Sequence, residues 1–225
     1  MEIKPIGYVR TDFGSKFGVP RQSGLAPSLS AVIEFEPEYR MAEAFKELEN
    51  YEYIWILWQF SEVPEGEWSP TCSPPRLGGN KRVGVFASRT PFRPNRIGLS
   101  SVRLDRVEHT KDRGTLLHVS GADVVDGTPV FDVKPYIAYA DSHPNAKSGF
   151  VDAYERKVLQ VVFCDEALAD FPGEKVDALR EVLAADPRPS YQSDPDRVYG
   201  FVFAGFDVKF KVAGEVLTVL TVARS

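Results

Sequence analysis

The sequence has little cysteine and no long hydrophobic run. Its two cysteines, Cys72 and Cys164, provide neither a disulfide framework nor a zinc cluster. The longest concentrated apolar run, Tyr53–Phe60, has the length of a strand and falls far short of the roughly 20 residues that span a bilayer. Met1–Ile6 lacks the apolar segment of a signal peptide. We therefore expect a cytoplasmic protein with reduced thiols and no membrane partner.

The common catalytic motifs are also missing. No Gly-x-Gly-x-x-Gly sequence follows an expected strand and no Walker A sequence occurs, so a Rossmann or P-loop nucleotide site has no support. The three histidines, His109, His118 and His143, are scattered, which favours structural roles. No Cys/His group has the spacing of metal ligands, so no metal is expected. No Gly-x-Ser-x-Gly element marks a nucleophilic serine.

What is present is the composition of an ordinary globular protein, with 225 residues, 43% hydrophobic and 26% charged. This predicts one large domain, or one domain with a small appendage. Short β-branched or aromatic runs predict strands at Ile3–Arg10, Ser30–Glu36, Tyr53–Phe60, Arg82–Ala87, Leu99–Thr110, Thr115–Ser120 and Val130–Pro135. One helix is expected at Tyr39–Glu49. Many short strands with frequent turns favour an antiparallel β-barrel or a sandwich.

The pattern changes after about residue 144, which predicts a small α+β domain. Its expected strands are Arg156–Cys164, Val198–Ala204, Asp207–Val212 and Val216–Ala223, with a hairpin turn at Ala213-Gly214. Helices are expected at Asp165–Phe171 and Glu174–Ala185, followed by the polar loop Asp186–Tyr191. We expect domains at residues 1–145 and 146–225.

Charge is unevenly distributed along a chain whose net charge is −5. The segment Arg76–Arg106 holds eight basic residues against one acidic residue, Asp105, whereas Ala31–Glu67 holds ten glutamates against two basic residues. One surface of the fold is therefore expected to be basic, either as a solvated face or as a nucleic-acid contact.

Arginines gather in one stiff loop. In Ser88–Gly98 the prolines Pro91 and Pro94 fix backbone angles, and Arg89, Arg93 and Arg96 are held between them and beside them. A pre-organised guanidinium loses less entropy when it meets a carboxylate or phosphate, so this loop favours anion binding. A second loop carries Asp123 and Asp126-Gly127, and Asp126 is either a plain turn residue or a catalytic base.

Six segments together resemble one family. They are Gly18-Val-Pro-Arg-Gln22, Pro75-Arg-Leu-Gly-Gly79, Gly84–Asn95, Asp126-Gly-Thr-Pro129, Asp132-Val-Lys-Pro-Tyr136 and Asp186-Pro-Arg-Pro-Ser-Tyr191. In this order they resemble the TsaA-like, TrmO-type methyltransferases, whose substrate is the N6-threonylcarbamoyladenosine next to the tRNA anticodon. The resemblance spans nearly the whole chain and implies a β-barrel, S-adenosylmethionine as cofactor, tRNA as partner through its anticodon loop, and a homodimer with shared sites.

The resemblance also implies a cofactor site. By position, its residues are Pro20, Arg21, Gln22, Ser61, Glu62, Arg89, Leu99 and the stretch Gly121, Ala122 and Asp123. Two positions depart from the family pattern. Ser61-Glu62 stands where the family has a His-Gln pair, and Arg96 replaces a proline, which adds a cation on the substrate side.

The chemistry of this reaction suggests roles for four further residues. The target nitrogen is a poor nucleophile while protonated, so Asp126, or else Asp123, is a candidate to accept its proton. Lys134 is a candidate to polarise the carbamoyl oxygen, and Arg93 or Arg96 to bind the threonyl carboxylate. Tyr191, Phe203 and Phe206 are candidates to stack on bases, with the two phenylalanines more expected in the core. Two alternatives remain open: a non-enzymatic RNA-binding barrel, and a barrel for a small anionic metabolite.

Overall fold

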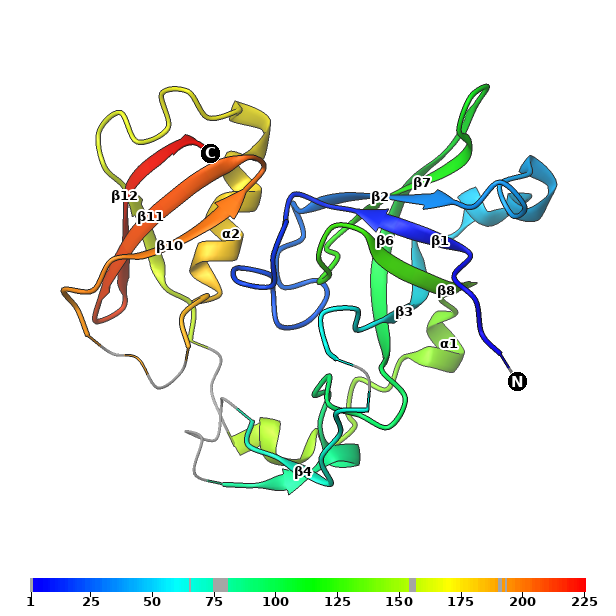
Figure 1. The fold of residues 1–225 in the computed structure, drawn as a ribbon, viewed down its shortest axis with the longest axis horizontal. Helices are drawn as coiled ribbons and strands as arrows, with labels where there is room; N and C mark the ends of the chain where they lie inside the picture. The colour runs from blue at the N-terminus through cyan, green and yellow to red at the C-terminus, as the bar shows by residue number, and fades with distance from the viewer. Residues whose placement is uncertain (1, 65, 75–80, 154–156, 190–191, 193) are drawn as a thin grey trace.

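A computed structural model describes the chain except residues 1, 65, 75–80, 154–156, 190–191 and 193. Within the described residues, six antiparallel strands close a barrel in the order β1-β2-β7-β6-β3-β8, and β8 pairs back onto β1 (Figure 1). The strands are β1 (Gly7–Arg10), β2 (Ser30–Phe35), β3 (Tyr53–Gln59), β6 (Ile97–Thr110), β7 (Gly114–Ser120) and β8 (Thr128–Pro135). The predicted mostly-β fold with a barrel is confirmed.

Buried and more exposed side chains alternate along the strands, and the buried ones form the barrel core. In β3 the side chains of Ile54, Ile56 and Trp58 are buried, whereas those between them are half-buried. Such alternation places every second side chain inside the barrel. Inward residues of the six strands, among them Val9, Ile33 and Leu117, form one apolar cluster that also takes in Phe45 from outside the barrel strands.

The C-terminal residues form a second layered unit. Its sheet has the order β10-β11-β12-β9, with β10 (Tyr199–Phe203), β11 (Phe206–Ala213), β12 (Val216–Arg224) and β9 (Gln160–Phe163), the last parallel to β12. Helix α2 (Val176–Ala184) covers the face of this sheet that is turned toward the barrel, after the single 3₁₀ turn Gly173–Lys175. The remaining short elements are α1 (Ala138–Asp141), after β8, the 3₁₀ turn Gly149–Ala153, and the two-residue strands β4 (Thr71–Cys72) and β5 (Val83–Gly84), which pair with each other.

Three expected elements are wrong. The helix expected at Tyr39–Glu49 is two 3₁₀ turns, Ala42–Phe45 and Leu48–Asn50, separated at Glu47, whose φ of 68° cannot continue a right-handed helix. The helix expected at Asp165–Phe171 is a series of turns that contains Glu166 at φ 64° and ends before Pro172. The second half of the strand expected at Arg82–Ala87 is the 3₁₀ turn Val85–Ala87, and only Val83–Gly84 is a strand.

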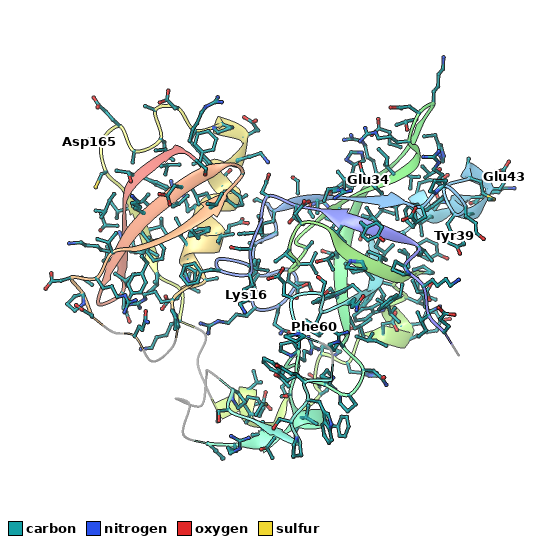
Figure 2. The ribbon with its side chains drawn as sticks, in the orientation of Figure 1. Lys16, Glu34, Tyr39, Glu43, Phe60 and Asp165 are labelled. Atoms are coloured by element: carbon teal, nitrogen blue, oxygen red, sulfur yellow. The ribbon has the colours of Figure 1, made fainter. Side chains whose placement is uncertain are left out.

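The loop after β1 belongs to the second core. Phe13, Ala26 and Leu29 pack with α2 and the inner faces of β10–β12, and the ring centroids of Phe13 and Phe203 lie 5.2 Å apart. Phe203 and Phe206 are buried in this cluster, so the expectation that they belong to the core is confirmed. Figure 2 shows Lys16 of the same loop between the barrel and the C-terminal unit. Apolar side chains from residues 13–29 thus join the two units.

We expect Phe13→Ala to lower the free energy of unfolding by about 3–5 kcal/mol, because a fully buried aromatic ring leaves a cavity in the core that joins the two units. Urea denaturation followed by circular dichroism measures the change. The control is Val202→Ala in β10, whose side chain is exposed and whose loss should cost less than about 1 kcal/mol. Equal stability losses in the two variants would contradict the assignment of Phe13 to this core.

Candidate active site at one end of the barrel

Antiparallel pairing decides which loops meet. Arg10 of β1, Ser30 of β2, Gln59 of β3, Ile97 of β6, Ser120 of β7 and Thr128 of β8 all lie at the same end of the barrel. The connections 11–29, 60–96 and 121–127 leave from that end, which we call the loop end. Every sequence-predicted site residue except Leu99 and Lys134 lies in one of these three connections. Segments far apart in the sequence are therefore neighbours in space.

One residue from each connection meets at the loop end. Arg89 donates a short hydrogen bond from Nη1 to the Gln22 side-chain oxygen, and the Gln22 amide nitrogen donates to the Arg21 carbonyl oxygen at 2.5 Å. The charge of Arg89 also acts on the Asp123 carboxyl. Gln22 thus fixes the position of the Arg89 guanidinium, whose charge acts on the Asp123 carboxyl, so a cation and an anion from separate connections belong to one cluster.

Two residues that the sequence analysis missed support Asp123. Ser100 Oγ donates to Asp123 Oδ1 at 2.5 Å, and Trp58 Nε1 donates to Ser100 Oγ at 3.0 Å. Burial raises the pKa of the Asp123 carboxyl above its ordinary value, while the hydrogen bond from Ser100 is the largest of the effects that lower it. A polar serine at an inward position of an expected strand, in step with Val102 and Leu104, is a signal that could have identified Ser100.

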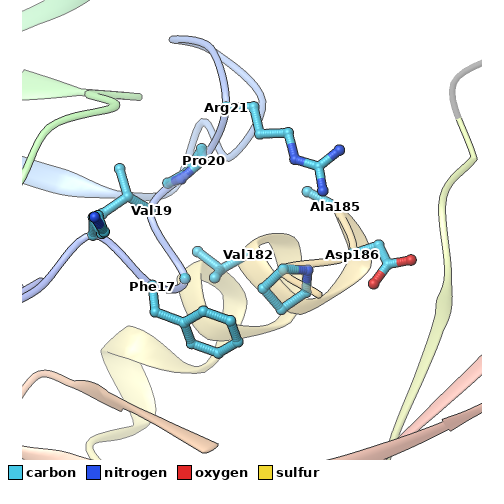
Figure 3. Close-up of a pocket in the computed structure, with 10 residues that line it drawn as sticks. Phe17, Val19, Pro20, Arg21, Val182, Ala185 and Asp186 are labelled. Carbon is cyan, nitrogen blue, oxygen red and sulfur yellow. The ribbon is translucent and has the colours of Figure 1, made fainter. Parts of the chain in front are cut away.

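Pro20 and Arg21 line a cleft toward the C-terminal unit (Figure 3). The cleft has a volume of about 170 Å³, and it lies between the segment Lys16–Arg21 and the residues Val182–Pro187 at the end of α2. Arg21 donates from Nη2 to the Arg188 carbonyl oxygen at 3.0 Å. Cofactor-sized pockets have volumes of roughly 300 Å³ or more, so this cleft does not hold a complete cofactor site.

Arg93 and Arg96 each bind backbone carbonyl groups near the loop end. Arg93 Nη1 donates to the carbonyl oxygens of Val85 and Ser88, at 3.1 and 2.7 Å, which holds the 3₁₀ turn next to Arg89. Arg96 Nη1 donates a short hydrogen bond to the Val63 carbonyl oxygen. Its own carbonyl accepts from the Phe60 backbone N–H at 2.9 Å. Arg96 therefore braces the turn that carries the exposed residues Ser61 and Glu62.

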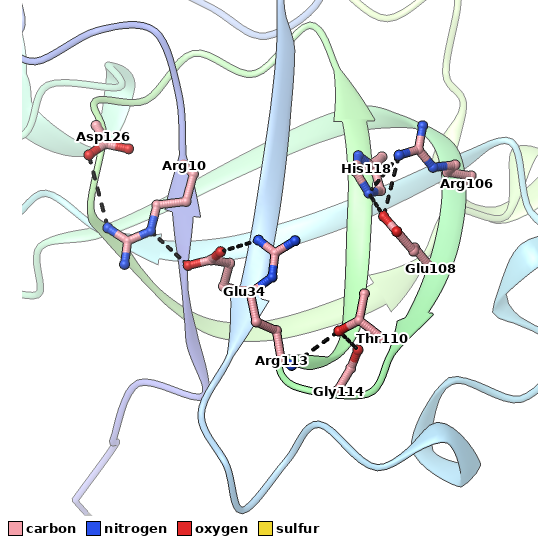
Figure 4. Close-up of polar contacts among 9 residues, drawn as sticks. All are labelled: Arg10, Glu34, Arg106, Glu108, Thr110, Arg113, Gly114, His118 and Asp126. Atoms are coloured by element: carbon pink, nitrogen blue, oxygen red, sulfur yellow. Dashed lines mark hydrogen bonds and ion pairs between the residues drawn. The ribbon is translucent and has the colours of Figure 1, made fainter.

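Asp126 is part of a turn that ties β8 to the end of β1. Its Oδ1 accepts from the Thr11 backbone N–H at 3.0 Å, and its Oδ2 lies 4.0 Å from Arg10 Nη1. Arg10 also binds Glu34, which in turn binds Arg113, and the two arginines lower the pKa of Glu34 by hydrogen bonding (Figure 4). Asp126 is exposed and lies at the loop end, where it can meet a ligand.

Lys134 and Leu99 stand apart from this cluster. Lys134 is near the far end of β8, where it pairs with Trp55 in the register and its Nζ lies 2.7 Å from Asp132 Oδ2. The six residue-to-residue steps from Thr128 to Lys134 span about 20 Å of strand. Leu99 follows the buried Gly98 and precedes the buried Ser100, so its side chain points to the outer face of the barrel.

Gly121 and Ala122, the remaining expected residues, support the loop end through backbone hydrogen bonds and core packing. The Gly121 carbonyl oxygen accepts from the Gly24 N–H, and the Gly121 N–H donates to the Leu29 carbonyl oxygen. Gly121 has φ +79°, a conformation that favours glycine. Ala122 packs into the barrel core. These contacts fix the backbone that carries Asp123 at the loop end.

The arrangement suits a polar ligand that carries one positive and one negative charge. A carboxylate, a guanidinium and a carboxamide converge at the loop end, and such groups bind ammonium, carboxylate and hydroxyl groups of a ligand. In the part of the chain that the structure describes, no group of three or more His, Cys, Asp or Glu side chains is arranged to hold a metal ion. None of the described helices is long and apolar enough to cross a membrane.

Comparison with known proteins identifies the family of both units. Residues 8–142 match the tRNA-methyltransferase O N-terminal domain, and residues 156–225 match the C-terminal domain of the same family. An Escherichia coli tRNA (adenine(37)-N6)-methyltransferase is 39% identical over 219 residues, which cover 94% of this chain and 93% of that protein. A Pseudomonas aeruginosa protein, provisionally named an S-adenosylmethionine-dependent methyltransferase, is 39% identical over 214 residues, which cover 92% of this chain and 90% of that protein.

Solved structures agree with this assignment. The crystal structure of TrmO from P. aeruginosa superposes with a TM-score of 0.82 at 33% sequence identity, and covers 100% of this chain and 97% of that chain. A further TrmO crystal structure gives a TM-score of 0.81 at 32% identity, with 99% of each chain covered. Both domains, the curated relatives and the solved structures give the same result: the chain belongs to the tRNA-methyltransferase O family.

Proposed function

We propose that this protein transfers a methyl group from S-adenosylmethionine to N6 of the threonylcarbamoyladenosine next to the anticodon of tRNA. Family membership supports the enzyme class and the cofactor, because the relatives are named for tRNA adenine-37 N6 methylation and for S-adenosylmethionine. The single observation that carries the site is the meeting of Gln22, Arg89 and Asp123 from three separate loops. A tRNA substrate also supports a cytoplasmic location.

The cofactor fits the loop end chemically. Its methionyl end carries an ammonium and a carboxylate, for which Asp123 and Arg89 are the complementary groups. We place Pro20, Arg21, Gln22, Ser61, Glu62 and the backbone of Leu99 and Gly121–Asp123 around it. When bound, S-adenosylmethionine supplies the electrophilic methyl group on its sulfonium sulfur. The protein must hold the nitrogen in line with that methyl group, which is chiefly a positioning task.

The chain's own residues then act on the substrate. Arg93 and Arg96 lie near the loop end, and a guanidinium is the group suited to bind the threonyl carboxylate. Asp126, exposed at the loop end, is the candidate acceptor for the N6 proton. Lys134 lies about 20 Å along β8 from the loop end. A role for Lys134 on the carbamoyl oxygen therefore requires that it come from a second copy of the chain.

A homodimer would provide the second copy of the chain that a role for Lys134 requires. Four large apolar side chains in the loop-end connections or beside them are exposed, namely Trp68, Phe86, Phe92 and Leu99, with exposed fractions of 54%, 78%, 44% and 55%. Exposed apolar side chains that gather in one region indicate an interaction surface. Basic side chains in the same region, Lys81 and Arg82, are exposed and suited to tRNA phosphates.

The substrate assignment predicts a specific product. We expect mass spectrometry of tRNA nucleosides, after incubation with protein and labelled S-adenosylmethionine, to show label only in threonylcarbamoyladenosine. A matched tRNA transcript that carries unmodified adenosine at the same position should remain unlabelled, because it lacks the carboxylate that the arginines would bind. Equal labelling of both tRNAs would reject the threonylcarbamoyl group as a recognition element. Binding of tRNA without any cofactor binding would favour a non-enzymatic RNA-binding module.

We expect Arg89→Ala to weaken binding of S-adenosylhomocysteine by roughly 10- to 150-fold, because a charge-assisted hydrogen bond is lost. The control is Arg82→Ala, an exposed arginine of the same connection that binds Thr71, and it should bind the cofactor product normally. Isothermal titration calorimetry measures both affinities.

At saturating cofactor, Arg93→Ala and Arg96→Ala should lower single-turnover methylation more than tRNA affinity. Full activity in the double variant would remove both arginines from the substrate site.

We expect sedimentation equilibrium at micromolar concentration to give twice the chain mass of 25.1 kDa. Phe86→Asp should shift the protein to the monomer, because a charge placed in an apolar interface must be desolvated. Val202→Asp, which adds the same charge on the C-terminal sheet away from the loop end, is the control and should remain a dimer. A wild-type protein that sediments as a monomer would contradict the dimer and with it the role of Lys134.

A further inference from the structure

A directional chain of hydrogen bonds runs from the barrel core to the loop end. It starts at the buried Trp58, passes through Ser100, a residue that is 2% exposed, and ends at the Asp123 carboxylate. The indole N–H of Trp58 can only donate, so Ser100 Oγ accepts there and turns its own proton to Asp123 Oδ1. This order of donors makes Asp123 the acceptor, as an ionised carboxylate requires.

Trp58, the first residue of this hydrogen-bond series, has a fixed position. A Cβ atom on Gly98 would come within 2.3 to 2.6 Å of the Trp58 indole ring, so the ring lies directly over the glycine backbone. The Phe60 ring packs against the indole with the ring centroids 4.4 Å apart. A tightly packed interior allows few alternative side-chain positions. The indole N–H therefore points at Ser100 in a fixed direction.

Asp123, the last residue of this hydrogen-bond series, accepts further hydrogen bonds and is influenced by a cation. Backbone N–H groups of Ser23 and of Asp123 itself donate to the carboxyl group, and Arg89, from the 60–96 connection, is a charged residue that acts on it. Arg89 is in turn held by Gln22. The opposite charges of Asp123 and Arg89 match the ammonium and carboxylate of an α-amino acid, which is the methionyl end of S-adenosylmethionine.

We propose that Ser100 and Trp58 are positioning residues that hold the Asp123 carboxylate ready to accept the ammonium group of the cofactor's methionyl end, with Arg89 on its carboxylate. This inference rests on the proposed cofactor. It assigns to the Asp123 side chain the recognition of the amino-acid end, and it explains why a buried serine is present in a strand whose other inward neighbours are apolar.

Two ligands separate this proposal from a general structural role. S-adenosylhomocysteine has the amino-acid end, and 5′-methylthioadenosine lacks it but retains the adenosine. We expect Asp123→Asn and Ser100→Ala to weaken binding of S-adenosylhomocysteine about tenfold or more, and to leave binding of 5′-methylthioadenosine within about twofold of wild type. Equal losses for both ligands would overturn the assignment to the amino-acid end.

The pH dependence gives a second readout. Affinity for S-adenosylhomocysteine should fall as the pH drops through the pKa of Asp123, because the protonated carboxyl no longer attracts an ammonium group. The hydrogen bond from Ser100 stabilises the ionised carboxylate and lowers its pKa. In Ser100→Ala the loss of affinity should therefore begin at a higher pH than in wild type. An unshifted pH profile would overturn the positioning role of Ser100.

Matched variants complete the test. Ser120→Ala removes another serine hydroxyl that donates to an aspartate, Asp105, on the exposed side of the barrel, and it should bind both ligands as wild type does. Trp58→Phe keeps Ser100 and an aromatic ring but removes the indole donor, so it should shift the profile in the same direction by less, and it carries the test if Ser100→Ala fails to fold. Wild-type protein that binds neither ligand would refute the proposed cofactor itself. If the wild-type protein binds both ligands and the variants show the same affinities and pH profiles, only the positioning role of Ser100 and Trp58 is refuted.

Discussion

Closure of the barrel is the constraint on which the rest of the structure depends. Antiparallel neighbours must reverse direction at each connection, so the connections alternate between the two ends of the barrel. Three of them, residues 11–29, 60–96 and 121–127, therefore leave from one end, although they are far apart in the sequence. The site residues in them need no single local motif, because β-sheet pairing brings Gln22, Arg89 and Asp123 together.

The C-terminal unit completes this end of the barrel. The connection that carries Gln22 also places Phe13 and Leu29 in the C-terminal core, and its Arg21 binds the carbonyl of Arg188. The Arg188 guanidinium forms a bidentate ion pair with Asp186 of its own loop. This pair stiffens the loop where the Arg188 carbonyl meets Arg21. The stability of the second core thereby limits the movement of a loop that we assign to the cofactor.

Much of the fold could be predicted from the sequence, and the failures have a common cause. The strands Tyr53–Gln59 and Thr128–Pro135 were expected at Tyr53–Phe60 and Val130–Pro135, because short β-branched and aromatic runs bounded by turn residues are typical of strands. The segments 39–49, 82–87 and 165–171 carried similar apolar patterns without forming the expected elements. Glu47 and Glu166 adopt positive φ, and Val85 has its carbonyl bound by the Arg93 guanidinium. Tertiary packing overrides weak local preferences in such short segments.

The barrel strands, the stiff arginine loop and the family could be predicted from the sequence, because residue patterns, proline positions and a run of specific motifs are properties of the chain order. Only the tertiary structure showed that Ser100 and Trp58 support Asp123 and that Lys134 lies at the opposite end of the barrel from the site. The physical reason is that these relations depend on register between strands. A shift of one residue in pairing turns every side chain to the other face, and local sequence patterns do not encode which partner stands across.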